Sequence, residues 1–143
     1  MSGGRSGNPH GARWLGRRWT NWAMLEDVLD RSVVPRQPGV YRLRGKRFTG
    51  LLYVGESGNL HERLIALRHA LGRAADGKTE KTGHWAAQNL HMRLKGRKLV
   101  VSWLKDAVPA KSERKGIECE CIAAHRWHLD RNPDCQFVSL EQQ

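Results

Sequence analysis

The sequence predicts a small α/β domain in which a three-stranded antiparallel sheet is flanked by helices and preceded by an extra N-terminal helix. Two runs that alternate like strands, residues 39–44 and 51–55, are joined by a turn at Gly45-Lys46 and predict a β-hairpin. A third run, residues 98–104, is rich in β-branched and aromatic residues. Apolar residues recur at helical spacing in the surrounding segments, so we expect helices to cover the sheet.

The N-terminal part is expected to add a tail and one helix. Residues 1–12 are rich in Gly and Ser, which predicts a mobile, weakly basic tail. Over residues 20–31 apolar positions recur every three or four residues, which predicts an amphipathic helix that ends before Pro35. We therefore divide the chain into a basic N-terminal tail and helix that contain Trp and Arg, residues 1–34, and a main domain, residues 35–143.

Three more helices are predicted from apolar stripes and their end signals. Asn59 and Glu62 fit a capping-box variant at the start of a helix over 60–72. A short helix is expected over 84–94. The last helix is expected to begin at Ser112, as its N-cap, and to end before Asn132-Pro133.

The composition indicates a polyanionic partner. The chain has 25 Lys and Arg against 14 Asp and Glu, a formal charge of +11, and each cation placed on a phosphate releases condensed counterions. No run of about 18 apolar residues occurs and the N-terminus lacks the apolar part of a secretory signal, so no membrane partner is expected. The cysteines lie in one short segment and favour a reducing, cytoplasmic location.

The only two tyrosines lie on the two strands of the predicted hairpin, which is expected to bring Tyr41 and Tyr53 side by side. Arg63 lies in the first turns of the next helix, where a guanidinium can bind a phosphate through two hydrogen bonds. Glu118 or Glu120 is expected to hold Mg²⁺ at the same corner, because Mg²⁺ binds one or two carboxylates together with water and phosphate oxygens. These groups together indicate phosphodiester hydrolysis.

Four motifs follow one another along these elements: Gly39-Val40-Tyr41, Tyr53-Val54-Gly55, Asn59-Leu60-x-x-Arg63 and Glu118-x-x-Cys121-Ile122. In this order they resemble the core of the GIY-YIG nuclease superfamily, over roughly residues 37–137. The resemblance implies a metal-dependent DNA endonuclease that uses Mg²⁺, with Mn²⁺ as the other option. It also implies hydrolysis that leaves a 5′-phosphate and a 3′-hydroxyl.

The resemblance implies a role for each of four catalytic residues. Tyr41 activates or orients the attacking water, and Tyr53 helps to position water and phosphate. Arg63 neutralises the charge that develops on the phosphate, and Glu118 ligates the metal. A free phenol has a pKa near 10, so Tyr41 is a base at neutral pH only if that pKa is lowered, and orientation of water stays open as the alternative.

The sequence departs from the family pattern beside these motifs. Glu56 stands where many relatives have a lysine, and His61 or His69 is expected to compensate. Leu67 stands where relatives often have a histidine or tyrosine. Both departures favour an alternative function, a catalytically weak or inactive nucleic-acid-binding module on the same scaffold.

The position of the metal-binding carboxylate has an alternative register. The family frequently has an Asn twelve residues after its glutamate, and Asn132 has that spacing from Glu120 (132 − 120 = 12). The Cys121-Ile122 pair at three and four residues after Glu118 nevertheless favours Glu118. Glu120 stays the alternative.

Basic and polar residues around this corner are expected to bind DNA. The candidates are Arg17, Arg18, Lys46, Asn59, His61 and His69. Trp14, Trp19 and Trp22 either stack on bases beside Arg17 and Arg18 or pack on the domain. A homodimer or a larger nuclease assembly is a further expected partner. Cys119, Cys121, His125, His128 and Cys135 leave a structural zinc site as a less favoured alternative.

Overall fold

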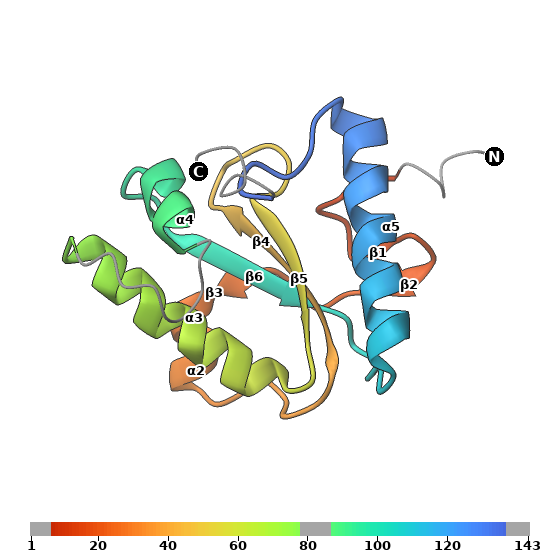
Figure 1. Ribbon diagram of the computed structural model, residues 1–143, viewed down its shortest axis with the longest axis horizontal. Helices are drawn as coiled ribbons and strands as arrows, with labels where there is room; N and C mark the ends of the chain where they lie inside the picture. The colour runs from red at the N-terminus through yellow and green to blue at the C-terminus, as the bar shows by residue number, and fades with distance from the viewer. Residues whose placement is uncertain (1–6, 78–86, 137–143) are drawn as a thin grey trace.

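Helices cover both faces of a four-stranded sheet in the computed structural model, which describes residues 7–77 and 87–136. Figure 1 shows α2, α3 and α4 on one side of the sheet and α5 with the short β1–β2 hairpin on the other. The elements are β1 (Arg13–Trp14), β2 (Arg17–Arg18), β3 (Ala23–Met24), α2 (Leu25–Asp30), β4 (Gly39–Gly45), β5 (Tyr53–Ser57), α3 (Leu60–Ala75), α4 (Ala87–Leu94), β6 (Leu99–Trp103) and α5 (Lys111–Leu129).

The strand order of the sheet is β3-β6-β4-β5, and all neighbours are antiparallel. β4 therefore lies between β5 and β6, and β5 forms an edge. The predicted α/β class, an antiparallel sheet flanked by helices, is confirmed. Within the described residues this sheet has four strands, where three were predicted, because Ala23 and Met24 pair with Val101 and Val100. β1 and β2 form a separate two-stranded sheet.

The helix predicted over residues 20–31 is shorter than expected and spans only Leu25–Asp30. The backbone before it is extended along β6. The Thr20 N–H donates to the Trp103 carbonyl at 2.8 Å, and the Thr20 hydroxyl accepts from the Trp103 N–H at 3.0 Å. The free edge of β6 thus offers backbone partners that outweigh the helical periodicity of this segment.

Three tryptophans of the N-terminal segment surround one fully buried arginine of β4. The Arg42 guanidinium lies 4.5 Å from the ring centroid of Trp19, 4.6 Å from that of Trp22 and 5.8 Å from that of Trp14. Burial lowers the pKa of Arg42 to about 9, which leaves it charged at neutral pH. The tryptophans therefore pack on the domain, and stacking on bases is not their role in this structure.

Backbone carbonyls complete the shell around this guanidinium. Arg42 donates to the carbonyls of Pro9 and Gly11 and to the Ser102 hydroxyl. The prediction of a mobile tail is therefore wrong for residues 7–12, which are tied to the sheet, while residues 1–6 lie outside the described part. The division of the chain at residue 34 stays a prediction.

The later helices are confirmed with changes at their described ends, and residues 84–86 of the short helix predicted over 84–94 lie outside the described part. α3 begins after Asn59, whose Oδ1 accepts from the Glu62 N–H at 3.1 Å, as the capping pattern predicts. α5 begins at Lys111, so the prediction of Ser112 as its N-cap is wrong. Arg114 holds this end instead, because its guanidinium donates to the backbone carbonyls of Val108 and Pro109 at 3.0 and 2.8 Å.

His125 of α5 is a fully buried structural residue. Its Nε2 accepts from the Leu51 N–H at 2.9 Å, and its Nδ1 lies 2.7 Å from the Arg131 carbonyl, to which it donates. Across residues 7–77 and 87–136, no group of three or more His, Cys, Asp and Glu side chains could hold a metal ion. The zinc alternative is therefore wrong for the described part of the chain, and Cys121 beside His125 belongs to the core.

We expect stability to fall with pH below about 6.5, the unfolded pKa of histidine. Burial lowers the pKa of His125 in the folded protein, so in this range the unfolded chain binds more protons. His125→Ala should lose about 1–3 kcal/mol at neutral pH, because the Leu51 N–H loses its acceptor. It should also lose less additional stability on acidification, as urea unfolding at several pH values would measure.

His69→Ala, which removes a histidine at an exposed position of α3, is the control. Part of the slope should persist in His125→Ala, because burial also lowers the pKa of His10. If the free energy of unfolding of His125→Ala depended on pH as steeply as that of wild type, the proposed contribution of buried His125 would be contradicted.

Candidate active site

The two tyrosines meet on one face of the β4–β5 pair. Tyr41 pairs with Gly55 and Leu43 with Tyr53, which places the phenols diagonally across the two strands. Their ring centroids are 6.3 Å apart, with the planes inclined at 38°. Tyr41 is only 1% exposed, whereas Tyr53 on the edge strand is partly exposed. The predicted juxtaposition of the tyrosines is therefore present.

Close packing explains why glycine, which has no side chain, stands at these positions in both tyrosine motifs. A Cβ at Gly55 would lie 2.5 Å from the Tyr41 hydroxyl, because the Tyr41 ring lies across the backbone of β5. A Cβ at Gly39 would lie 2.9 Å from the Leu60 side chain at the start of α3. The glycines thus permit close approach of the phenol to β5 and of α3 to β4.

Burial raises the pKa of both phenols. For Tyr53 the charge of Glu118 is the next cause and raises the pKa further, while Arg63 lowers it. The charges of Arg63 and Glu118 also act on Tyr41, in the same directions. Both phenols therefore carry their proton at neutral pH, so the geometry favours orientation of water over abstraction of its proton by a free phenolate.

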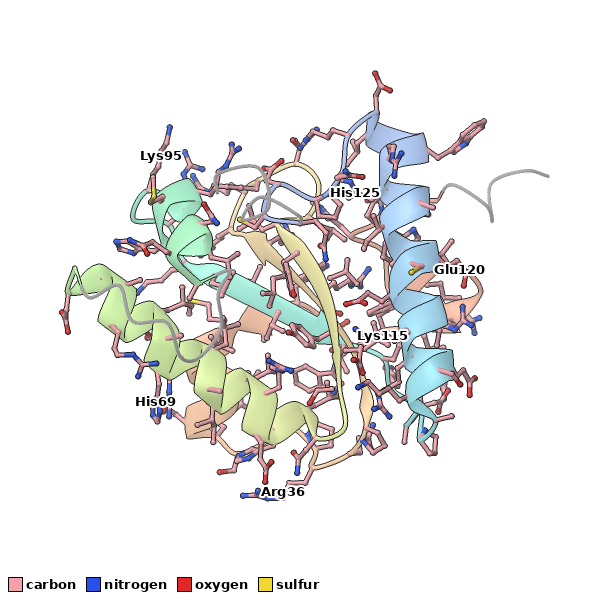
Figure 2. The ribbon with its side chains drawn as sticks, in the orientation of Figure 1. Arg36, His69, Lys95, Lys115, Glu120 and His125 are labelled. Carbon is pink, nitrogen blue, oxygen red and sulfur yellow. The ribbon has the colours of Figure 1, made fainter. Side chains whose placement is uncertain are left out.

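The two candidate carboxylates lie in different surroundings on α5. The Glu118 side chain is 16% exposed, and its Oε1 lies 3.8 Å from Lys115 Nζ. Burial raises the pKa of Glu118, against the opposing charges of Lys115 and Arg63. Glu120 is 50% exposed and pairs at 3.2 Å with Arg17 of β2. Figure 2 shows Lys115 between α5 and β5, and Glu120 on another side of the helix.

Arg63 is exposed in the first turn of α3, and its backbone N–H donates to the Asn59 carbonyl at 3.1 Å. Its charge lowers the pKa of both phenols and of Glu118. The Asn59 side chain is committed to capping α3. His61 is partly buried and His69 is exposed, on the outer side of α3 in Figure 2.

An ion-pair network at Glu56 was not predicted from the sequence. The Glu56 carboxylate accepts from Arg114 Nε at 2.7 Å and lies 3.5 Å from Lys115 Nζ. Although burial raises the pKa of Glu56, these two cations hold it below its usual value. The sequence signal that could have predicted this network is the basic pair Arg114-Lys115, which lies one helical turn before Glu118 on the same helix.

The other basic candidates are spread over the surface. Arg17 and Arg18 lie on β2, and Arg18 contacts Asp106 at 3.4 Å. Lys46 lies in the turn after β4 and donates its backbone N–H to the Lys98 carbonyl at 2.9 Å. It lines a basic hollow with Arg47, Gly96, Arg97 and Lys98. The structure therefore does not bring Lys46 to the tyrosines through any described contact.

The residues fit a divalent cation of the Mg²⁺ type. Such an ion needs few protein ligands, since it keeps water and phosphate oxygens in its coordination shell. Glu118 offers one largely buried carboxylate whose charge acts on both phenols. Because no cluster of three acidic, His or Cys ligands exists in the described residues, a site built wholly from protein side chains is excluded there.

Comparison with solved structures finds the GIY-YIG N-terminal endonuclease domain of UvrC from Thermotoga maritima, in several point mutants bound to a catalytic divalent cation. One is 17% identical, with a TM-score of 0.46, and the match covers 78% of this chain and 94% of that one. Another is 18% identical, with a TM-score of 0.46 over 78% and 92%. A third is 18% identical, with a TM-score of 0.43 over 76% and 93%.

The chain matches no family model and no curated protein sequence. The described residues contain no helix long and apolar enough to cross a membrane.

The position of Glu118 can be tested without any substrate. We expect Glu118→Gln to lower the pKa of Tyr53, because its negative charge now raises that pKa. Glu120→Gln should leave it unchanged, since Glu120 pairs with Arg17 instead. The chain has two tyrosines, so NMR titration of labelled tyrosine resolves both. A larger change of the Tyr53 pKa in Glu120→Gln than in Glu118→Gln would contradict the position given to Glu118.

Proposed function

We propose that the protein is a metal-dependent DNA endonuclease of the GIY-YIG type. The observation that carries this proposal is the pair of protonated tyrosines on β4 and β5, on both of which the opposite charges of Arg63 and Glu118 act. A phosphodiester bears negative charge that grows at the non-bridging oxygens during attack. A guanidinium and a carboxylate-bound cation are the groups that stabilise such charge.

In this proposal the phenols position the reactants. Tyr41, deep beside Gly55, orients the attacking water through its hydroxyl, and Tyr53 at the exposed edge positions water and phosphate. Arg63 binds the phosphate, and Glu118 ligates Mg²⁺ or Mn²⁺, which supplies Lewis-acid stabilisation of the phosphate charge. The oxygen of the attacking water bonds to phosphorus and its proton passes to solvent water, while the bond to the 3′ oxygen breaks and that oxygen takes a proton from solvent water. The products are a 5′-phosphate and a 3′-hydroxyl.

The basic surface supports DNA as the substrate. We propose phosphate contacts for Arg17, Arg18 and Lys46, and contacts near the catalytic corner for His61 and His69. Asn59 contributes by fixing the start of α3, because its side chain caps this helix. The described residues give no support for a homodimer. All three cysteines are free thiols, which supports the predicted cytoplasmic location.

Plasmid cleavage tests the proposal. We expect nicking or cutting only with Mg²⁺ or Mn²⁺. Glu118→Gln and Arg63→Ala should each lower the rate constant by a factor on the order of 10²–10³, the scale for loss of one group that stabilises transition-state charge. Glu120→Gln, on the same helix, is the matched control and should stay near wild type.

Each contrary outcome has a distinct meaning. Cleavage that persists in EDTA would contradict the mechanism. Inactive wild-type protein that still binds duplex, branched or single-stranded DNA would support the alternative, a binding module. A dead Glu120→Gln beside an active Glu118→Gln would move the metal to Glu120.

A further inference from the structure

Lys115 connects the two acidic side chains that face it from β5 and α5. Its Nζ lies 3.5 Å from Glu56 Oε2 and 3.8 Å from Glu118 Oε1. The two carboxylates are 11% and 16% exposed, so both are largely removed from water. A cation between them offsets their mutual repulsion.

The neighbouring Arg114 cannot take over this position. Its Nε donates to Glu56 Oε1 at 2.7 Å, and its Nη1 donates to the carbonyls of Val108 and Pro109. The Arg114 side chain is only 8% exposed, so it is fixed by burial and by its partners. Lys115 is 55% exposed and has a flexible four-carbon stem. Of the two cations on Glu56, Lys115 is therefore the one that can reach a substrate.

The histidines expected to compensate for Glu56 have no described contact with this network. The charges that act on Glu118 are those of Lys115, Glu56 and Arg63. His69 is exposed on the outer side of α3 (Figure 2). Compensation for Glu56 by His61 or His69 stays a prediction, and Lys115 of α5 is a further cation, one with a described contact to Glu56.

We propose that Lys115 binds the scissile phosphate, and that Glu56 is the positioning residue that keeps its ammonium at the catalytic corner. The inference rests on the proposed nuclease function. A divalent cation at Glu118 would repel the ammonium from that carboxylate while Glu56 still holds it nearby. The ammonium, with three donors, then faces the phosphate from the α5 side, and Arg63 faces it from α3.

Removal of Lys115 should have opposite effects on metal affinity and on the cleavage rate. Without DNA, Lys115 competes with a divalent cation for Glu118, so its removal should tighten metal binding. With DNA, its removal should leave the phosphate charge partly unneutralised and slow the chemical step. A residue with only a structural role would weaken both properties.

The test compares Lys115→Met with Lys115→Arg and with Lys111→Met, a control at the exposed first turn of α5. In Lys115→Met we expect kcat for plasmid cleavage to fall on the order of 10²-fold, with a smaller change in KM. Mn²⁺ affinity without DNA, from electron paramagnetic resonance, should rise about fivefold. Lys115→Arg should keep most activity, and Lys111→Met should match wild type in both assays.

Glu56→Gln tests the positioning role. We expect a smaller fall in kcat than in Lys115→Met. The Gln amide oxygen can still accept from Arg114 Nε, so α5 should keep its place. The double variant should then be no slower than Lys115→Met alone, because both changes act through one ammonium. Thermal unfolding measured in parallel identifies any loss of fold. A double variant slower by the product of the two single effects would contradict the positioning role.

The failures of this inference and of the proposed function are distinguishable. Wild-type cleavage together with full activity in Lys115→Met would overturn the lysine assignment and leave the nuclease function intact. Wild-type protein that cleaves no DNA with Mg²⁺ or Mn²⁺ would overturn the function and the lysine role together. Unchanged or weaker Mn²⁺ binding in Lys115→Met would overturn the competition at Glu118.

Discussion

The buried ion pair between Glu56 and Arg114 determines how α5 lies against the edge strand β5. Both side chains are about nine-tenths buried, and their contact is 2.7 Å. Removal of one partner from such a pair leaves an uncompensated buried charge and costs roughly 3–5 kcal/mol. Because Glu118 follows Arg114 by one turn of α5, this pair also holds the Glu118 side of the helix toward β5. The site therefore depends on a contact that joins no catalytic candidate.

A second buried arginine has the same function on the opposite flank of the hairpin. Arg42 of β4 fixes the N-terminal segment through three tryptophans and two backbone carbonyls. This segment supplies β3 and places Arg17 beside Glu120. Glu120 follows Glu118 by two residues and therefore lies on another side of α5, where it pairs with Arg17. Some basic residues of this chain are therefore buried structural cations. The net charge of +11 counts them, so the positive charge at the surface is smaller than that number.

The sequence predicted the hairpin, α3 and the meeting of Tyr41 and Tyr53, because strand alternation and helix capping are local signals. It did not predict β3, since pairing with the distant β6 outweighed local helical periodicity. The roles of Glu56 and Arg114 also depend on contact between residues 58 positions apart. For the same reason, spacing alone left Glu118 and Glu120 unresolved, whereas their different neighbours in space separate them.

A crystal structure with uncleaved DNA and Ca²⁺ tests the central claim most directly, namely that the Glu56–Arg114 pair places Glu118 as the metal ligand beside the tyrosines. We expect one Ca²⁺ bound to Glu118 and to a phosphate oxygen, with the Glu56–Arg114 contact unchanged. The same phosphate should lie between Arg63 and Lys115, next to Tyr53. A Ca²⁺ ion on Glu120, or a DNA backbone that passes the tyrosines at a distance, would contradict the account.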